Sequence, residues 1–168
     1  MKFFTKISHY FIKKAETRVG TRLDYVHAIA DSDIGLLVRY NRLFGFLDPC
    51  KYLPRDAYHV ARLRGALAAD CGTCVQVEIN LARQAGLDSE WIKNILSGIA
   101  DGPLQDVMVL SDSVVQMRQD NPEARHAILS AYGEKALIEL SFAMNGAALL
   151  PGIKRAMGHA TTCDLNVM

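Results

Sequence analysis

The sequence predicts an all-α protein of about eight helices with an N-terminal helical arm. Apolar residues recur at helical spacing through most of the chain, and no segment keeps the two-residue alternation that is typical of a strand. Glycines and prolines separate these periodic segments, as they do at helix ends and turns. A length of 168 residues is that of one domain, which is long enough to bury a core without disulfides.

The first expected helix covers residues 3–14 and is amphipathic and basic. Its apolar positions are Phe3, Phe4, Ile7, Tyr10 and Phe11, and lysines 2, 6, 13 and 14 lie between and after them. Such a helix is either an arm that binds a membrane surface or a partner, or an ordinary helix that packs its Phe face on the protein or on another subunit.

Two more helices complete the expected arm. Gly20 is a candidate C′ glycine, and Thr21 is a candidate N-cap with Asp24 three residues later in the capping-box position. A further helix is expected from about Ser32 to Phe44, where apolar residues again recur at helical spacing.

The clearest break in the chain follows this arm. Pro49 and Pro54 bound a segment that cannot continue a helix, which predicts a boundary there. We therefore expect an N-terminal helical extension over residues 1–53, a core over 54–158 and a C-terminal tail over 159–168, all within one globular unit.

Helical periodicity resumes after the break and continues to residue 157. Gly86 is a candidate C′ glycine, and Asp88 or Ser89 is a candidate N-cap for the helix that follows it. Prolines 122 and 151 are each expected to open a helix, since proline is favoured in the first turn. The expected core helices cover about 56–69, 71–84, 90–97, 104–117, 122–145 and 151–157.

Composition argues against several classes of protein. Nineteen basic and eighteen acidic residues give a net charge of +1, which argues against a nucleic-acid partner. The longest apolar run, around 147–153, is interrupted by Pro151 and Gly152, so no integral membrane segment is expected. The first residues lack a signal-peptide pattern, and four cysteines are too few for a disulfide scaffold. Together these features favour the reducing cytoplasm.

The functional site is expected at Cys71-Gly72-Thr73-Cys74. On an ideal helix that starts there, Cys71, Cys74 and Glu78 form one stripe at spacings i, i+3 and i+7, on the face opposite a polar cluster. A carboxylate on that buried face needs a partner or a raised pKa. A cysteine at a helix N-terminus is favoured as thiolate, so this motif is typical of a redox dithiol.

The same region resembles the alkylhydroperoxidase D (AhpD) and carboxymuconolactone decarboxylase family. The redox members carry Glu, eleven residues, Cys-x-x-Cys, three residues and His. Here the frame reads His59, eleven residues, Cys71 to Cys74, three residues and Glu78, so both cysteines match and the two relay residues are exchanged. The resemblance covers roughly residues 56–158 and implies the AhpD-like helical fold.

The resemblance also implies roles and partners. Cys74 would attack a peroxide or a disulfide, Cys71 would resolve the product, and Glu78 with His59 would form an altered proton relay, joined by a hydrogen bond between the two helices. It implies no organic cofactor and no metal. A dithiol protein would supply electrons, and the chain would assemble as a homo-oligomer, either a trimer or a hexamer.

Other interpretations stay open. The decarboxylase branch of the family implies a lyase or isomerase that acts on a carboxylated lactone, although that branch does not depend on a cysteine pair. The dithiol can also be vestigial in a non-catalytic oligomeric protein. Zinc is a further alternative, because His159-x-x-x-Cys163 offers a second pair of ligands. Arginines 55, 62 and 64 either lower a thiol pKa or hold an anionic substrate, or they form a solvated basic face.

Overall fold

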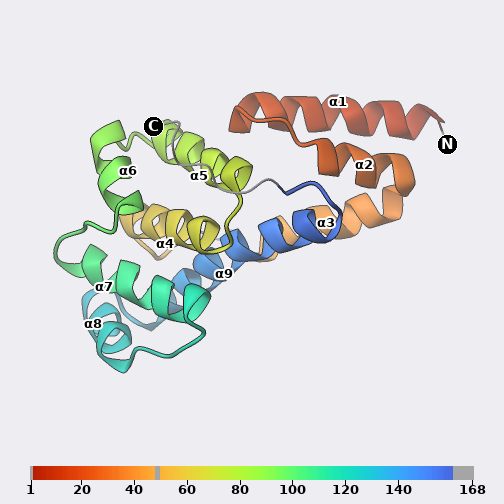
Figure 1. Cartoon of the computed structure of the whole chain (residues 1–168). Helices are drawn as coiled ribbons and strands as arrows, with labels where there is room; N and C mark the ends of the chain where they lie inside the picture. The colour runs from red at the N-terminus through yellow and green to blue at the C-terminus, as the bar shows by residue number, and fades with distance from the viewer. Residues whose placement is uncertain (1, 48–49, 161–168) are drawn as a thin grey trace.

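The computed structural model describes residues 2–47 and 50–160, and helices are the only regular elements in this part of the chain. The predicted all-α fold class is therefore confirmed. The described residues form nine α-helices and one short π-helical segment. Figure 1 shows the first three helices on one side of the molecule and the remaining helices gathered around two crossing helices.

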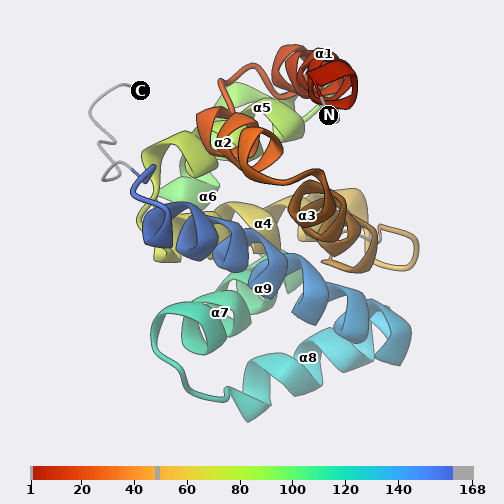
Figure 2. The same ribbon diagram turned by 90° about the vertical axis from the view of Figure 1, so that its right-hand side faces the viewer.

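The arm consists of α1 (Lys2–Val19), α2 (Asp24–Ser32) and α3 (Ile34–Leu47). Its helices form a small hydrophobic cluster of their own, to which α9 contributes Leu150. Buried side chains in this cluster are Ile12, Tyr25, Val26, Ala30 and Tyr40. Figure 2 shows these three helices lying along one side of the central helices.

The structure changes two expectations about α1 and the turn after it. α1 continues to Val19 instead of ending near Lys14, and Gly20, at φ +65°, stands at its C-terminal end as expected. Thr21 does not cap α2, because Leu23 occupies the N-cap position and the buried Thr21 hydroxyl has no hydrogen-bond partner. Among the α1 side chains that the structure describes, Ile12 is buried in the arm, whereas Phe4 and Phe11 are exposed.

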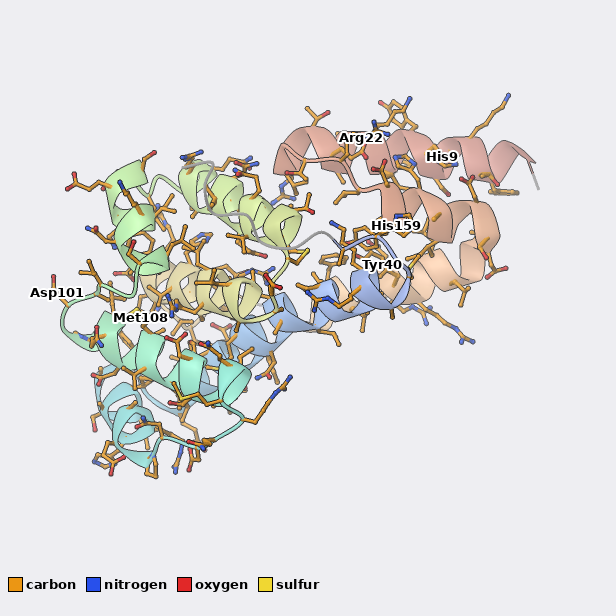
Figure 3. All side chains as sticks on the ribbon, in the orientation of Figure 1. His9, Arg22, Tyr40, Asp101, Met108 and His159 are labelled. Carbon is orange, nitrogen blue, oxygen red and sulfur yellow. The ribbon has the colours of Figure 1, made fainter. Side chains whose placement is uncertain are left out.

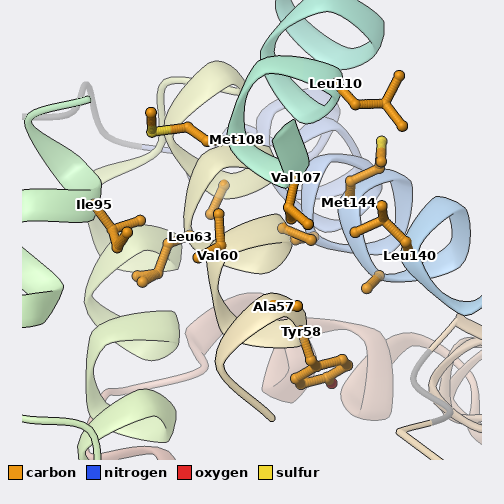
Figure 4. Close-up of a cluster of buried hydrophobic side chains, with 14 of the residues drawn as sticks. Ala57, Tyr58, Val60, Leu63, Ile95, Val107, Met108, Leu110, Leu140 and Met144 are labelled. Carbon is orange, nitrogen blue, oxygen red and sulfur yellow. The ribbon is translucent and has the colours of Figure 1, made fainter. Parts of the chain in front are cut away.

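The centre of the molecule is the crossing of α4 (Arg55–Ala68) with α9 (Glu134–Ala156), the most extensive helix contact in the fold. Gly65 makes the close approach possible, because a Cβ built there would lie 2.3 Å from the carbonyl oxygen of Met144. Leu63, Val60, Leu140 and Met144 are fully or almost fully buried around this crossing (Figure 4).

The other helices cover this pair. They are α5 (Gly72–Gln84), α6 (Ser89–Leu96), α7 (Pro103–Ser111) with its π-helical continuation η1 (Asp112–Gln116), and α8 (Pro122–Tyr132). In Figure 2, α7 and α8 lie on the opposite side of α9 from the arm. The CxxC helix α5 therefore lies between the arm and the core, and it contacts both α1 and α4.

The C-terminal half departs from the expected helix limits at two positions. The expected helix 122–145 is interrupted at Gly133, whose φ of +82° is incompatible with a continuous α-helix. Pro151 does not open a new helix, because it lies inside α9 with its ring fully buried. Burial of the proline ring and of its neighbours offsets the backbone hydrogen bond that proline cannot donate.

A buried carboxylate fixes the connection between the arm and the core. Glu139 of α9 accepts backbone N–H groups from Lys51, Tyr52 and Leu53, at N···O distances of 2.6–3.1 Å. These donors would otherwise lack partners in the loop that precedes α4. The loop is thereby held against α9 where α4 begins.

Within the described residues, α9 is the one helix that is long and apolar enough to cross a membrane, with a mean hydropathy of 1.4 in its most apolar window. Length and composition are weak evidence, because the central helix of a packed core meets the same criteria. Of that window, 44% is buried inside the molecule, where α9 crosses α4.

Candidate dithiol site

Cys71 and Cys74 lie at the start of α5, as the motif predicts. Cys71 is the N-cap residue, and its carbonyl oxygen accepts the backbone N–H groups of Cys74 and Val75, each at 2.9 Å. The two Sγ atoms are 2.7 Å apart, which is within hydrogen-bonding contact and longer than a disulfide bond. Both are free thiols; Cys71 is fully buried and Cys74 is half-buried.

The turn before the motif is held by the end of α9. Asp70 has a φ of +48°, a left-handed conformation that is uncommon for a residue other than glycine. Arg155 donates from one guanidinium nitrogen to the carbonyl oxygens of Ala69 (2.9 Å) and Asp70 (2.6 Å). This clamp fixes the direction in which the chain enters the Cys-x-x-Cys segment.

Lys154, the residue before that arginine, brings a buried positive charge to the thiols. Its Nζ donates to Thr73 Oγ1 at 2.7 Å and lies 4.0 Å from Cys71 Sγ. A buried ammonium group is costly unless a hydrogen bond or an opposite charge compensates it. A thiolate on the cysteine pair is the anion that this position would stabilise most directly.

Two tyrosines of the arm lie near the site. Tyr25 of α2 and Tyr40 of α3 are buried, and their hydroxyl groups form a hydrogen bond with each other. Lys154 Nζ lies 5.9 Å from the centre of the Tyr25 ring. Burial raises the pKa of Tyr25 to about 12, its bond to Tyr40 lowers it, and negative charge on Cys74 or Cys71 raises it. The arm therefore contributes to the surroundings of the dithiol.

The protonation of Cys74 depends on its neighbours. Burial is the largest effect and raises the pKa of the Cys74 thiol, and the hydrogen bond and charge of Cys71 raise it further. The ammonium group of Lys154 lowers the same pKa, while Glu78 raises it slightly. Because the two sulfur atoms are so close, their protons belong to the pair. The net direction is a raised pKa for the Cys74 thiol, which the Lys154 ammonium opposes by favouring the thiolate.

Glu78 is buried as expected, and its partner is Arg62. The guanidinium group donates from Nε to Oε2 (2.8 Å) and from a terminal nitrogen to Oε1 (2.7 Å), so both carboxylate oxygens are occupied. Both side chains are about 5% exposed, which makes this a buried bidentate ion pair. The expected hydrogen bond between Glu78 and His59 is not formed, because Arg62 comes from the next turn of the same helix and takes both oxygens.

His59 is buried beside this ion pair, and its Nδ1 atom has no hydrogen-bond partner. Burial is the main cause that lowers the pKa of His59; Glu78 acts in the opposite direction, and Arg62 and Arg55 lower it further. The ring packs edge-on against Tyr58, with ring centres 5.2 Å apart. The charge of Glu78 therefore acts on the pKa of Cys74. The pKa of His59 responds instead to Glu78 and Arg62.

The lowered pKa of His59 predicts a loss of stability in acid. Below its ordinary value of 6.5 the unfolded chain binds a proton that the folded chain resists, so the free energy of unfolding falls as the pH falls through that range. Substitution of His59 by phenylalanine should remove this contribution. Urea denaturation from pH 7 to pH 5 should show a steeper loss for the wild type than for His59→Phe. Parallel profiles would contradict the assignment.

The three arginines do not form one solvated basic face, because Arg62 and Arg64 are largely buried in ion pairs and only Arg55 of the three is exposed. Arg64 makes a bidentate pair with Asp112 at 2.7 and 2.8 Å and donates to the carbonyl oxygens at the end of α6. Arg55 donates to the Ala85 carbonyl oxygen at 2.7 Å, next to the C-terminal end of α5. Together with Arg62, they tie α4 to α5, α6 and η1.

The zinc alternative rests partly on Cys163, which lies outside the described residues. Among the residues that the structure does describe, no three His, Cys, Asp or Glu side chains are grouped as metal ligands. A cavity of about 400 Å³ lies beside the turn that precedes the motif, and its lining includes Ala69, Asp70, Arg118 and Arg155. Neither thiol lines this cavity.

Sequence reasoning found the cysteines, Glu78 and His59, but it did not assign Arg62 to Glu78 and it missed Lys154, Tyr25 and Tyr40. The basic pair 154–155 in the last turn of α9 was a visible signal, although a helix C-terminus favours such residues without any further role.

No family model, curated protein or solved structure matches this chain.

Proposed function

We propose that this chain is a thiol–disulfide oxidoreductase that reduces a peroxide or a disulfide, as the resemblance to the AhpD-like family implies. The observation that carries the proposal is the pair of free thiols 2.7 Å apart at the start of α5, with the buried Lys154 ammonium 4.0 Å from one of them. Two adjacent free thiols beside a fixed positive charge are suited to giving up two electrons.

In this proposal Cys74 is the attacking residue, because it is the half-buried member of the pair and substrate can reach it more readily. Its thiolate displaces the alcohol from a peroxide, ROOH, and becomes a sulfenic acid. Cys71 then attacks that sulfur, water leaves, and a disulfide forms. The pair has lost two electrons and ROOH has been reduced to ROH and water.

Lys154 favours the ionised form of the pair, while Thr73 holds the lysine in place through its hydroxyl group. A dithiol protein in the reducing cytoplasm would return the disulfide to two thiols. Assembly into a homo-oligomer, trimer or hexamer, remains part of the proposal. Glu78 and His59 would act on the site through Arg62 and the local field, rather than by accepting the thiol proton directly.

The two cysteine roles can be separated with single variants. In Cys71→Ser a peroxide should leave a sulfenic acid on Cys74, which a dimedone probe captures, because no second thiol can resolve it. In Cys74→Ser the peroxide should not be consumed, and Cys71 should remain a thiol. Cys50→Ser, at the exposed cysteine, is the matched control and should behave as the wild type. A sulfenic acid on Cys71 in Cys74→Ser, at the wild-type rate, would reverse the assigned roles.

Lys154→Met should make the thiolate form of the cysteine pair less stable. Removing a positive charge 4.0 Å from the sulfur should lower the rate of alkylation of the pair by iodoacetamide at neutral pH by about tenfold. The rate should recover at alkaline pH, because the loss is one of ionisation. Lys93→Met, an exposed lysine on α6, is the control. An unchanged pH profile in Lys154→Met would show that this lysine does not act on the thiols.

A further inference from the structure

The outer face of α1 carries exposed apolar side chains on the arm. Phe4, Tyr10 and Phe11 are 61–66% exposed and Ile7 is 38% exposed. At about 100° per residue, Ile7, Tyr10 and Phe11 lie within one stripe that turns away from the buried Ile12. Because Tyr10 and Phe11 also pack edge-on, with ring centres 5.6 Å apart, they form a contiguous apolar surface on this helix.

The exposed charged side chains on the same helix are all basic. Lys6, Lys13, Lys14 and Arg18 are exposed on it. Residues 2–19 contain a single acidic residue, Glu16, and this carboxylate is turned inward, where it accepts the Leu23 backbone N–H at 2.7 Å and lies 3.3 Å from His27 Nε2. The exposed face of α1 therefore carries aromatic and basic side chains, and it carries no acidic side chain.

The helix is fixed in this orientation by contacts on its inner side. The rings of His9 and His27 stack with their centres 4.7 Å apart, and His9 Nε2 lies 2.7 Å from Asp31 Oδ1. Figure 3 shows His9 on the side of α1 that faces α2. At the other end, Asn80 and Gln84 of α5 donate to the last carbonyl oxygens of α1. The apolar face cannot turn inward without breaking these contacts.

We propose that this face binds the surface of an anionic lipid bilayer. An interfacial helix places aromatic and aliphatic side chains at the boundary between headgroups and acyl chains and directs lysines to anionic headgroups, which is the combination seen here. A second copy of the chain is a poorer occupant, because a two-fold contact of this face with itself would oppose lysines to lysines. The peripheral contact is independent of the redox proposal.

Sedimentation of the full-length protein with vesicles tests this. We expect binding to phosphatidylcholine vesicles that contain phosphatidylglycerol, weaker binding to phosphatidylcholine alone, and release by salt. The double variant Ile7→Ser/Phe11→Ser should bind at least about tenfold more weakly. Ile138→Ser, at an exposed apolar position on α9, is the matched control and should bind as the wild type. Circular dichroism checks that each variant is folded.

Three outcomes would overturn the proposal. The first is a wild type that does not bind the anionic vesicles. The second is a double variant that binds as well as the wild type, which would place the contact elsewhere, for instance on α9. The third is a wild type that ignores vesicles but sediments as an oligomer that Ile7→Ser/Phe11→Ser dissociates, which would make this face an interface between copies of the chain.

Discussion

Replacing Arg62 by methionine is expected to lower the free energy of unfolding by about 3–5 kcal/mol. The reason is the charge left behind: Glu78 would be a buried carboxylate without the two guanidinium hydrogen bonds that it now accepts at 2.7 and 2.8 Å. Urea denaturation at neutral pH measures the loss. Arg125→Met is the matched control, because Arg125 pairs with Asp120 at the surface and should be dispensable.

The double variant Arg62→Met/Glu78→Leu separates the cost of an unpaired charge from the value of the pair itself. Removing both charges should recover most of the stability that Arg62→Met loses, since an apolar pair of similar volume can replace a buried ion pair at little cost. A double variant as unstable as Arg62→Met would mean that the loss comes from packing or from other contacts of Arg62. The redox assay on the double variant also tests whether Glu78 is needed by the thiols.

Gly65→Ala should be the most damaging substitution by a single methyl group. The added Cβ would meet the Met144 carbonyl oxygen at 2.3 Å, and that oxygen belongs to a helix backbone, which cannot rotate away. We expect α4 and α9 to be forced apart, at a cost of about 3 kcal/mol, measured by thermal or urea unfolding.

Gly152→Ala in α9 is the matched control for that variant. A Cβ at Gly152 meets nothing within 4 Å, so the helix preference of alanine should raise stability by about 0.5–1 kcal/mol. Equal effects of the two substitutions, in either direction, would show that α4 and α9 are not packed as closely as the structure has them.

Much of the fold follows from local sequence signals. Helical periodicity and the absence of alternation were sufficient for the all-α class, and Gly20 and Gly86 end their helices as expected. The two wrong limits in the C-terminal half have a common cause. Gly133 and Pro151 are both compatible with a helix interior or with a helix end, and packing against α4 and α8 decides between them. Sequence periodicity does not report that packing.

The candidate site was predictable only where its parts are close in sequence. Cys71, Cys74 and Glu78 lie on one helix, so their common stripe followed from helix geometry. Lys154 reaches the thiols from 83 residues away, and no local pattern relates the two segments. Arg62 lies close to His59 in the sequence, but its ion pair with Glu78 depends on the distance between α4 and α5. Of the alternatives left open for the first helix, packing of its Phe face on the same chain does not occur at Phe4 and Phe11, which are exposed, and Ile12 is buried instead.

The most direct test of the redox account is to map the cysteines after one equivalent of peroxide. Fully reduced protein is exposed to the pulse, remaining thiols are alkylated, and the peptides are identified by mass spectrometry. The account predicts a new bridge between Cys71 and Cys74, reversed by a dithiol, with Cys50 still alkylated. Persistence of both thiols, whose sulfur atoms already lie 2.7 Å apart, would contradict it and leave the pair as a structural element of α5.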